Sequence, residues 1–163
     1  MNGLAHLAVY DAVVMLQWAA LPLEPERQHA TVTALTSGRM RLAMSQPLLD
    51  EIRGVLFRPE IQERFPSLTP PHAAAILKKA MEFADLFDNV PRRFGLPLHP
   101  KDDHLFDLAI ESKASYLVTW ENRILRLDKG TSEESKRLRE LAPGLRILSP
   151  ATLAKELKAD PQK

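Results

Sequence analysis

The most informative part of the sequence is the stretch from Lys101 to Leu125, KDDHLFDLAIESKASYLVTWENRIL. Its first half places apolar residues at helical spacing and begins with two acids, which is typical of a helix N-terminus. Its second half, 116–119, is short, aromatic and β-branched, and predicts a strand buried on both faces of a parallel sheet. Glu121 follows that strand directly. Because polar groups gather for function at the carboxyl ends of such strands, we expect the acids of this stretch to meet at one sheet edge.

The size and composition of the chain favour a single globular domain. It has 163 residues, 45% of them hydrophobic, and a formal net charge of +1. We expect one domain over 1–157 and a disordered tail over 158–163. The chain lacks cysteine, which excludes disulfides and thiolate metal sites, so that any metal ligand must be oxygen or imidazole. It has neither a long apolar run nor a basic leader, which predicts a cytoplasmic protein with no membrane span.

The rest of the chain alternates between strand and helix patterns. Further strands are expected at 7–10, 39–44 and 145–148. Helices are expected at 13–20, 26–36, 46–57, 70–87, 133–141 and 150–157, with a proline-rich loop over 66–71 and a loop over 89–100 that has room for one short strand. This alternation predicts an α/β fold with a mostly parallel central sheet flanked by helices.

Four acids occupy comparable places in this scheme. Asp11 ends the first strand, Glu51 lies among the apolar positions of a helix, Asp103 begins a helix, and Glu121 follows a strand. Carboxylates that lie close together raise one another's pKa and cost stability, unless a cation accompanies them. Mg²⁺ and Mn²⁺ prefer oxygen ligands, and such an ion activates water for phosphoryl displacement. The four acids therefore predict a Mg²⁺ or Mn²⁺ site.

Three segments of the chain resemble the PIN domain family, in particular the branch of toxin components of toxin–antitoxin pairs. They are SQPLLDEIRGVLFRP, PKDDHLFDLAIESKASYLVTWENRIL and the closing ILSP, and the resemblance spans about 7–157. It implies an α/β nuclease that cuts RNA with Mg²⁺ or Mn²⁺. It assigns the catalytic and metal-binding acids to four positions, with Asp102 as an adjacent alternative to the third: Asp11, Glu51, Asp103 and Glu121.

The sequence departs from the family pattern at two motifs. The family usually opens with Asp-Thr-Asn, whereas this chain has Asp11-Ala12-Val13. The family's closing Gly-Asp-Arg-Asp is here Trp120-Glu121-Asn122-Arg123, so that an acid becomes the longer Glu121 and a second acid becomes Arg123. Losing groups that orient metal ligands typically lowers activity about 10–100-fold. The alternative function is therefore a non-catalytic PIN domain that binds RNA or a protein.

Each acid also has an ordinary structural explanation. Asp11 is suited to cap the following helix. Glu51 is suited to a partly exposed helix position, and Glu121 to a surface ion pair with Arg123 or Arg126. Asp107 is either an additional ligand or a solvated acid. His72, His99 and His104 lack metal-ligand spacing and are expected at the surface. The residues expected to contact RNA flank the proposed site, and an ordinary charged surface is the competing explanation: Arg92, Arg93, Lys101, Trp120 and Arg123, with Arg126.

The expected partners are RNA and, by family analogy alone, a small antitoxin protein or a second copy of the chain in a homodimer. A nucleotide-binding flavodoxin-like domain is a poorer alternative. The glycines stand at 3, 38, 54, 95, 130 and 144, and none forms a glycine-rich phosphate loop after a strand.

Overall fold

The structure, a computed structural model, describes residues 6–20 and 30–159. Within these residues, five strands form one sheet in the order β3-β2-β1-β4-β5, and every neighbouring pair is parallel. The strands are β1 His6–Tyr10, β2 Met40–Met44, β3 Ala84–Leu86, β4 Tyr116–Val118 and β5 Arg146–Leu148. The predicted α/β fold with a parallel central sheet is confirmed.

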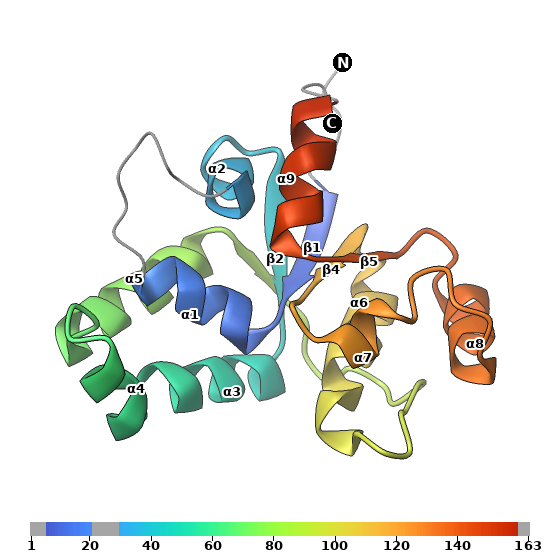
Figure 1. The fold of residues 1–163 in the computed structure, drawn as a ribbon, viewed down its shortest axis with the longest axis horizontal. Helices are drawn as coiled ribbons and strands as arrows, with labels where there is room; N and C mark the ends of the chain where they lie inside the picture. Colours follow the sequence, from blue (N-terminus) through green and yellow to red (C-terminus); the bar gives the residue numbers. More distant parts are fainter. Residues whose placement is uncertain (1–5, 21–29, 160–163) are drawn as a thin grey trace.

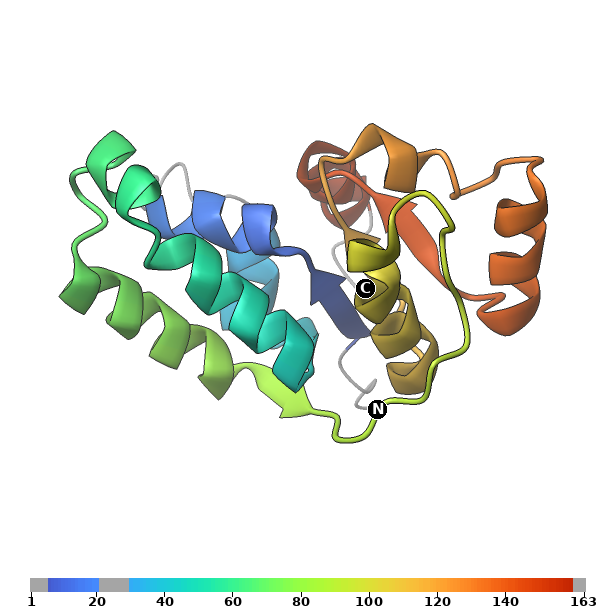
Figure 2. The same cartoon turned by 90° about the horizontal axis from the view of Figure 1, so that it is seen from below.

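Helices lie on both sides of the strands. Figure 1 shows α1, α3, α4 and α5 gathered on one side and α6, α7 and α8 on the other, and Figure 2 shows the same two groups from below. Their bounds are α1 Ala12–Ala20, α2 Ala30–Thr36, α3 Gln46–Leu56, α4 Pro59–Arg64, α5 Pro70–Glu82, the 3₁₀ turn η2 Pro100–Asp102, α6 Asp103–Ser112, α7 Asn122–Leu125, α8 Glu133–Leu141 and α9 Pro150–Ala159.

The strand β1 lies at the centre of the sheet because its residues are apolar and pair on both sides. Ala8 pairs with Leu42 of β2 and with Tyr116 of β4. The chain runs outward from β1 through β2 to β3, then returns through α6 to place β4 on the other side of β1. The strand order therefore reverses between β1 and β4. In open parallel sheets, ligands bind at the carboxyl ends of the strands at this point.

Two predicted helix starts are confirmed by their caps. The Ser45 hydroxyl accepts a hydrogen bond from Leu48 N at 3.4 Å, and the Thr69 hydroxyl accepts one from His72 N at 3.3 Å. Each satisfies a backbone N–H that has no partner within its helix. These caps fix where α3 and α5 begin, and α3 carries Glu51.

The prediction of one helix over 70–87 is wrong at its C-terminal end. The helix α5 ends at Glu82, and β3 follows at once, pairing in parallel with β2. Leu42 N donates to Phe83 O, and Phe87 N donates to Met44 O, both at 2.8 Å. Apolar residues at 83, 84 and 87 suit the helical spacing, but pairing with the edge of β2 gives this segment a strand's hydrogen bonds.

Other boundaries differ by smaller amounts. The short helices α4 and α7 were not predicted, and no strand forms in the described loop 89–99. The helix expected over 26–36 is described from Ala30, and residues 26–29 lie outside the described part. The last helix, expected to end at Leu157, continues to Ala159, and the rest of the expected disordered tail, 160–163, lies outside the described residues. Among the helices that are described, none has the length and apolar character to cross a membrane.

Candidate functional site

The carboxylate of Asp11 lies at the centre of the candidate site, where β1 ends beside β4. Its side chain is nearly buried, with 6% relative exposure. One carboxylate oxygen accepts a hydrogen bond from Val14 N at 3.0 Å and so caps α1, and the other accepts one from the Thr119 hydroxyl. The same hydroxyl accepts a hydrogen bond from Glu121 N at 3.1 Å. Thr119 therefore joins the acid after β1 to the acid after β4.

Two of the other predicted acids, Glu51 and Glu121, act on Asp11. Burial raises the pKa of Asp11 above its ordinary value, and the hydrogen bonds from Thr119 and Val14 lower it. The charges of Glu51 and Glu121 raise the pKa of Asp11 further. Glu51 and Glu121 therefore lie within electrostatic range of Asp11.

Glu51 reaches this edge from α3, which Leu48 and Ile52 anchor in the core. Its Oε2 lies 3.3 Å from Nε2 of His104 on α6. This oxygen is shielded from solvent and, among the described residues, accepts no hydrogen bond of good geometry. His104 was expected at the surface, but its side chain is only 23% exposed and packs against α3.

Asp103 is bonded to the loop that precedes α6. Its Oδ1 accepts a hydrogen bond from Leu96 N at 2.9 Å, and its Oδ2 lies 3.2 Å from Nη2 of Arg92. A Cβ atom on Gly95 would lie 3.1 Å from the same Oδ2, so the absence of a side chain at position 95 permits this close approach. The carboxylate of Asp103 is thus occupied by the segment 92–96.

Asp107 has neither of the roles that the sequence leaves open. It is buried, and its Oδ1 accepts hydrogen bonds from Arg93 N at 2.8 Å and from Phe94 N at 2.9 Å. Because 93–96 is not part of the sheet, these backbone N–H groups need side-chain acceptors. Asp103 and Asp107 supply them and fix the segment against α6.

The side chain of Arg123 links Asp102 to Glu121. The Nη2 of Arg123 lies 3.0 Å from Oδ2 of Asp102, and its Nη1 lies 3.2 Å from Oε2 of Glu121. Asp102 makes no side-chain capping bond to α6. Asp102, the alternative to Asp103 as a metal ligand, therefore shares the guanidinium of Arg123 with Glu121.

The contacts of the acids decide which of them are available to hold a divalent cation. In the described parts of the chain, no three or more acidic or histidine side chains are grouped closely enough to share a metal ion. However, Asp11 is buried and Glu51 keeps a shielded oxygen without a good donor. Two carboxylates, completed by water and substrate phosphate, are a usual Mg²⁺ environment. Asp11 and Glu51 therefore fit such an ion, whereas Asp102 and Glu121 are already paired with Arg123.

The residues predicted to contact RNA surround the edge unevenly. The side chain of Arg92 is 82% exposed despite its contact with Asp103, and Lys101 is exposed as well. Trp120 is 40% exposed and donates its indole N–H to Gln17. Arg93 instead lies 2.6 Å from Glu111, about two turns along α6 from Asp103. Arg92, Lys101 and Trp120 thus present free surface near the acids, and Arg93 does not lie with them.

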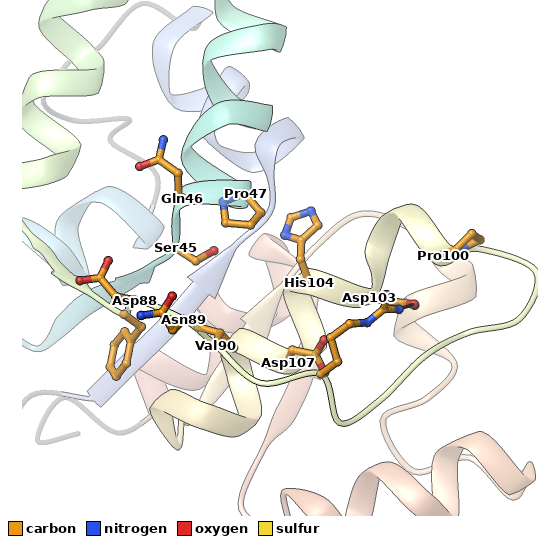
Figure 3. Close-up of a pocket in the computed structure, with 12 residues that line it drawn as sticks. Ser45, Gln46, Pro47, Asp88, Asn89, Val90, Pro100, Asp103, His104 and Asp107 are labelled. Atoms are coloured by element: carbon orange, nitrogen blue, oxygen red, sulfur yellow. Dashed lines mark hydrogen bonds and ion pairs between the residues drawn. The ribbon is translucent and has the colours of Figure 1, made fainter.

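A cavity of about 730 Å³ opens between the start of α3, the segment 87–92 and α6, and Asp103, His104 and Asp107 line it on the side of α6. Figure 3 shows His104 standing between Pro47 of α3 and Asp103, with Ser45 and Asn89 across the cavity. Asn89 has a left-handed backbone conformation with φ 53°. Small-molecule pockets typically measure about 300–1,000 Å³, so a nucleotide-sized group can be accommodated here.

Sequence reasoning missed Thr119 and Gly95. Thr119 was assigned only to a strand, yet a hydroxyl directly after a buried strand and two residues before an acid is a signal for such a bridge. The importance of Gly95 had no signal in the sequence, because it depends on where Asp103 points.

The chain was compared with known families and proteins. A family model described as PIN domain matches residues 8–123, which is more than half of the chain and includes Asp11, Glu51, Asp103 and Glu121. No curated protein and no solved structure matches the chain.

Proposed function

The chain belongs to the PIN domain family, and from this premise we propose that it is a Mg²⁺- or Mn²⁺-dependent endoribonuclease. The observation that carries the proposal is the nearly buried carboxylate of Asp11 at the carboxyl end of β1, which Thr119 links to the backbone of Glu121. The charges of Glu51 and Glu121 also raise the pKa of Asp11. This arrangement costs stability in the absence of a cation, because each added negative charge opposes the ionisation of Asp11. A structural role alone gives no reason for such a cost.

Asp11 and Glu51 are the proposed ligands of the cation, which would supply acidity for activating water and positive charge for the scissile phosphate. Thr119 is a positioning residue, because its hydroxyl fixes one oxygen of Asp11 while Val14 N fixes the other. Arg92 and Lys101 are proposed to neutralise RNA phosphates, and Trp120 to stack on a base. The cavity beside His104 would receive a nucleotide next to the scissile bond.

The test is the cleavage of single-stranded RNA with Mn²⁺ by matched variants. Glu51→Gln and Asp11→Asn should each lower the cleavage rate at least about 100-fold, because each removes a proposed ligand. The control is Asp50→Asn, since Asp50 precedes Glu51 on the same helix but is exposed and bonds to Gln46 at 2.7 Å. It should cleave like the unaltered protein. Equal rates for Glu51→Gln and Asp50→Asn would contradict the proposal.

Asp103→Asn tests whether this acid contributes to the chemistry. Asp103 is bonded to Leu96 N and paired with Arg92. If its role is to hold the segment 92–96, cleavage should fall less in Asp103→Asn than in Asp11→Asn. A loss as large as that of Asp11→Asn would restore Asp103 as a ligand.

A second candidate function is a non-catalytic RNA- or protein-binding module. The contacts of Arg123 with Asp102 and Glu121 favour it, because they leave fewer carboxylates for metal. Calorimetry distinguishes the candidates: heat of Mn²⁺ binding at micromolar affinity supports the nuclease, and RNA binding without such heat supports the module.

A toxin role, an antitoxin partner, a homodimer and a cytoplasmic location are proposed on the family resemblance alone. Growth arrest on expression that Glu51→Gln relieves and Asp50→Asn does not would support the toxin role.

A further inference from the structure

Arg123 lies between two acids that come from different parts of the chain. Asp102 ends the 3₁₀ turn η2 before α6, and Glu121 follows β4. Both Nε and Nη2 of Arg123 donate to Oδ2 of Asp102, at 3.2 and 3.0 Å, and Nη1 lies 3.2 Å from Glu121. One guanidinium thus contacts both carboxylates. Arg123 occupies the position at which the closing motif of the PIN family has an acid.

The two acids favour the charged form of the guanidinium. The hydrogen bond to Asp102 raises the pKa of Arg123 above its ordinary value, and the charges of Asp102 and Glu121 act in the same direction. The side chain of Asp102 is only 13% exposed and that of Arg123 is 38% exposed, so this contact is partly shielded from water. By comparison, Arg92 makes its contact with Asp103 while 82% exposed.

The acids at this edge therefore fall into two pairs. Arg123 neutralises Asp102 and Glu121. Asp11 has only the Thr119 hydroxyl and a backbone N–H as hydrogen-bond donors in the described structure, and Glu51 has only the 3.3 Å contact with His104. The permanent positive charge of Arg123 thus neutralises Asp102 and Glu121 but not Asp11 and Glu51.

We propose that Arg123 is a built-in cation that occupies the space between Asp102 and Glu121 in place of a divalent metal ion. The protein then binds fewer divalent ions than its acids would otherwise allow, and this half of the edge folds without metal. The inference deepens the proposed function and rests on it only for the site at Asp11 and Glu51. The replacement of a metal ion by the guanidinium involves only Asp102, Glu121 and Arg123, and it does not depend on metal binding at Asp11 and Glu51.

The test measures Mn²⁺ binding by calorimetry in the full chain. Arg123→Gln should bind Mn²⁺ at least about tenfold more tightly than the unaltered protein, or bind one additional ion, because two carboxylates lose their counter-charge. The control is Arg139→Gln, since Arg139 is exposed on α8 and its Nη1 donates to Gly130 O at 2.7 Å. Arg139→Gln should leave Mn²⁺ binding unchanged. Equal Mn²⁺ binding in Arg123→Gln and the unaltered protein overturns the proposal.

A second variant separates charge from geometry. Arg123→Lys keeps the positive charge but loses the planar fork, and it should stay within about threefold of the unaltered protein in Mn²⁺ affinity. A gain as large as that of Arg123→Gln would overturn the proposal. If Arg123→Gln is unfolded in EDTA, recovery of its circular dichroism on adding Mn²⁺ supports the proposal, and failure to recover counts against it.

These outcomes are separable from those of the proposed function. If the unaltered protein binds no Mn²⁺ and cuts no RNA, the nuclease proposal fails, yet a gain in Arg123→Gln still supports the role of Arg123. If cleavage depends on Glu51 but Arg123→Gln gains nothing, the nuclease stands and the inference fails.

Discussion

At the scale of single residues, Asp11 makes stability depend on pH in an unusual direction. Its folded pKa lies above the ordinary value of 3.8, mainly because of burial. Between these two values the folded state binds more protons than the unfolded state, so stability falls as pH rises through this window. Above the folded pKa the full cost of the buried charge is present. Below 3.8 the contribution of Asp11 to this pH dependence disappears.

Asp11→Asn should therefore unfold at a higher denaturant concentration than the unaltered protein at pH 7 without metal, and the advantage should shrink as the pH approaches 3. Urea titrations at several pH values in EDTA measure it. Asp50→Asn, which alters an exposed acid, should show a difference that changes much less with pH. If Asp11→Asn were less stable at pH 7, the capping bond to Val14 and the bond from Thr119 would outweigh the buried charge.

The sequence indicates which acids are candidates for the site, but it does not indicate which groups each carboxylate contacts. Asp11, Glu51 and Glu121 can be chosen because strand ends and an inward-facing helix position place them at one edge. The choice between Asp102 and Asp103 cannot be made, because both begin the same helix. In the structure the segment 92–96 occupies Asp103 through Leu96 N and Arg92, and the position of that loop is not encoded in any periodicity.

At the scale of elements, the segment 93–96 is held to α6 by carboxylates instead of by strand pairing. Asp107 accepts two of its backbone N–H groups and Asp103 accepts a third. Gly95 lies so close to Asp103 that a methyl group would have to displace the carboxylate. The packing of this loop on α6 therefore depends on a missing side chain.

Two glycine-to-alanine changes should have opposite signs. Gly95→Ala should lower the free energy of unfolding by about 1–2 kcal/mol, because it crowds Asp103. Gly54→Ala should raise it by about 1 kcal/mol, because Gly54 is exposed in α3 with open space around a Cβ. Thermal denaturation measures both, at about 2–4 °C per kcal/mol for a chain of this size. Stabilisation by Gly95→Ala would show that Asp103 is free to move.

Element prediction succeeds where local chemistry decides and fails where pairing decides. Ser45 and Thr69 mark their helix starts through their own hydroxyl groups. The boundary between α5 and β3 has no such signal, because Phe83 and Phe87 suit a helical stripe as well as a short strand. What separates the two is the free edge of β2, which is contributed by residues about forty positions earlier.

At the scale of the whole molecule, the order of the strands determines the site. The reversal between β1 and β4 brings Asp11 and Glu121 together across more than a hundred residues, with Thr119 between them. Alternating patterns predict the parallel sheet and which ends of the strands carry the acids. They do not predict the strand order, because each buried strand is similarly apolar. The order follows from the path of the chain through α6.

The net charge of the molecule predicts how RNA binding responds to salt. With a formal charge of +1, the protein exerts little long-range attraction on RNA, so affinity should depend on a few local cations. If Arg92, Lys101 and Arg126 neutralise about three phosphates, the logarithm of affinity should fall with that of salt at a slope of about −2. Between 50 and 200 mM salt, this slope corresponds to roughly a 15-fold loss.

Arg92→Gln should make this slope shallower by about 0.7, because one phosphate contact is lost. The matched control is Lys158→Gln, since Lys158 is exposed near the end of α9, which Figure 1 places toward the start of β1, whereas Asp11 follows the end of that strand. Fluorescence anisotropy of a labelled single-stranded RNA in EDTA, which prevents cleavage, measures both slopes. A slope that Lys158→Gln alters as much as Arg92→Gln would mean that RNA binds without reference to the carboxyl edge. A slope that only Arg92→Gln alters would place the phosphate backbone beside Arg92, at the cavity that Arg92 and Asp103 line next to His104.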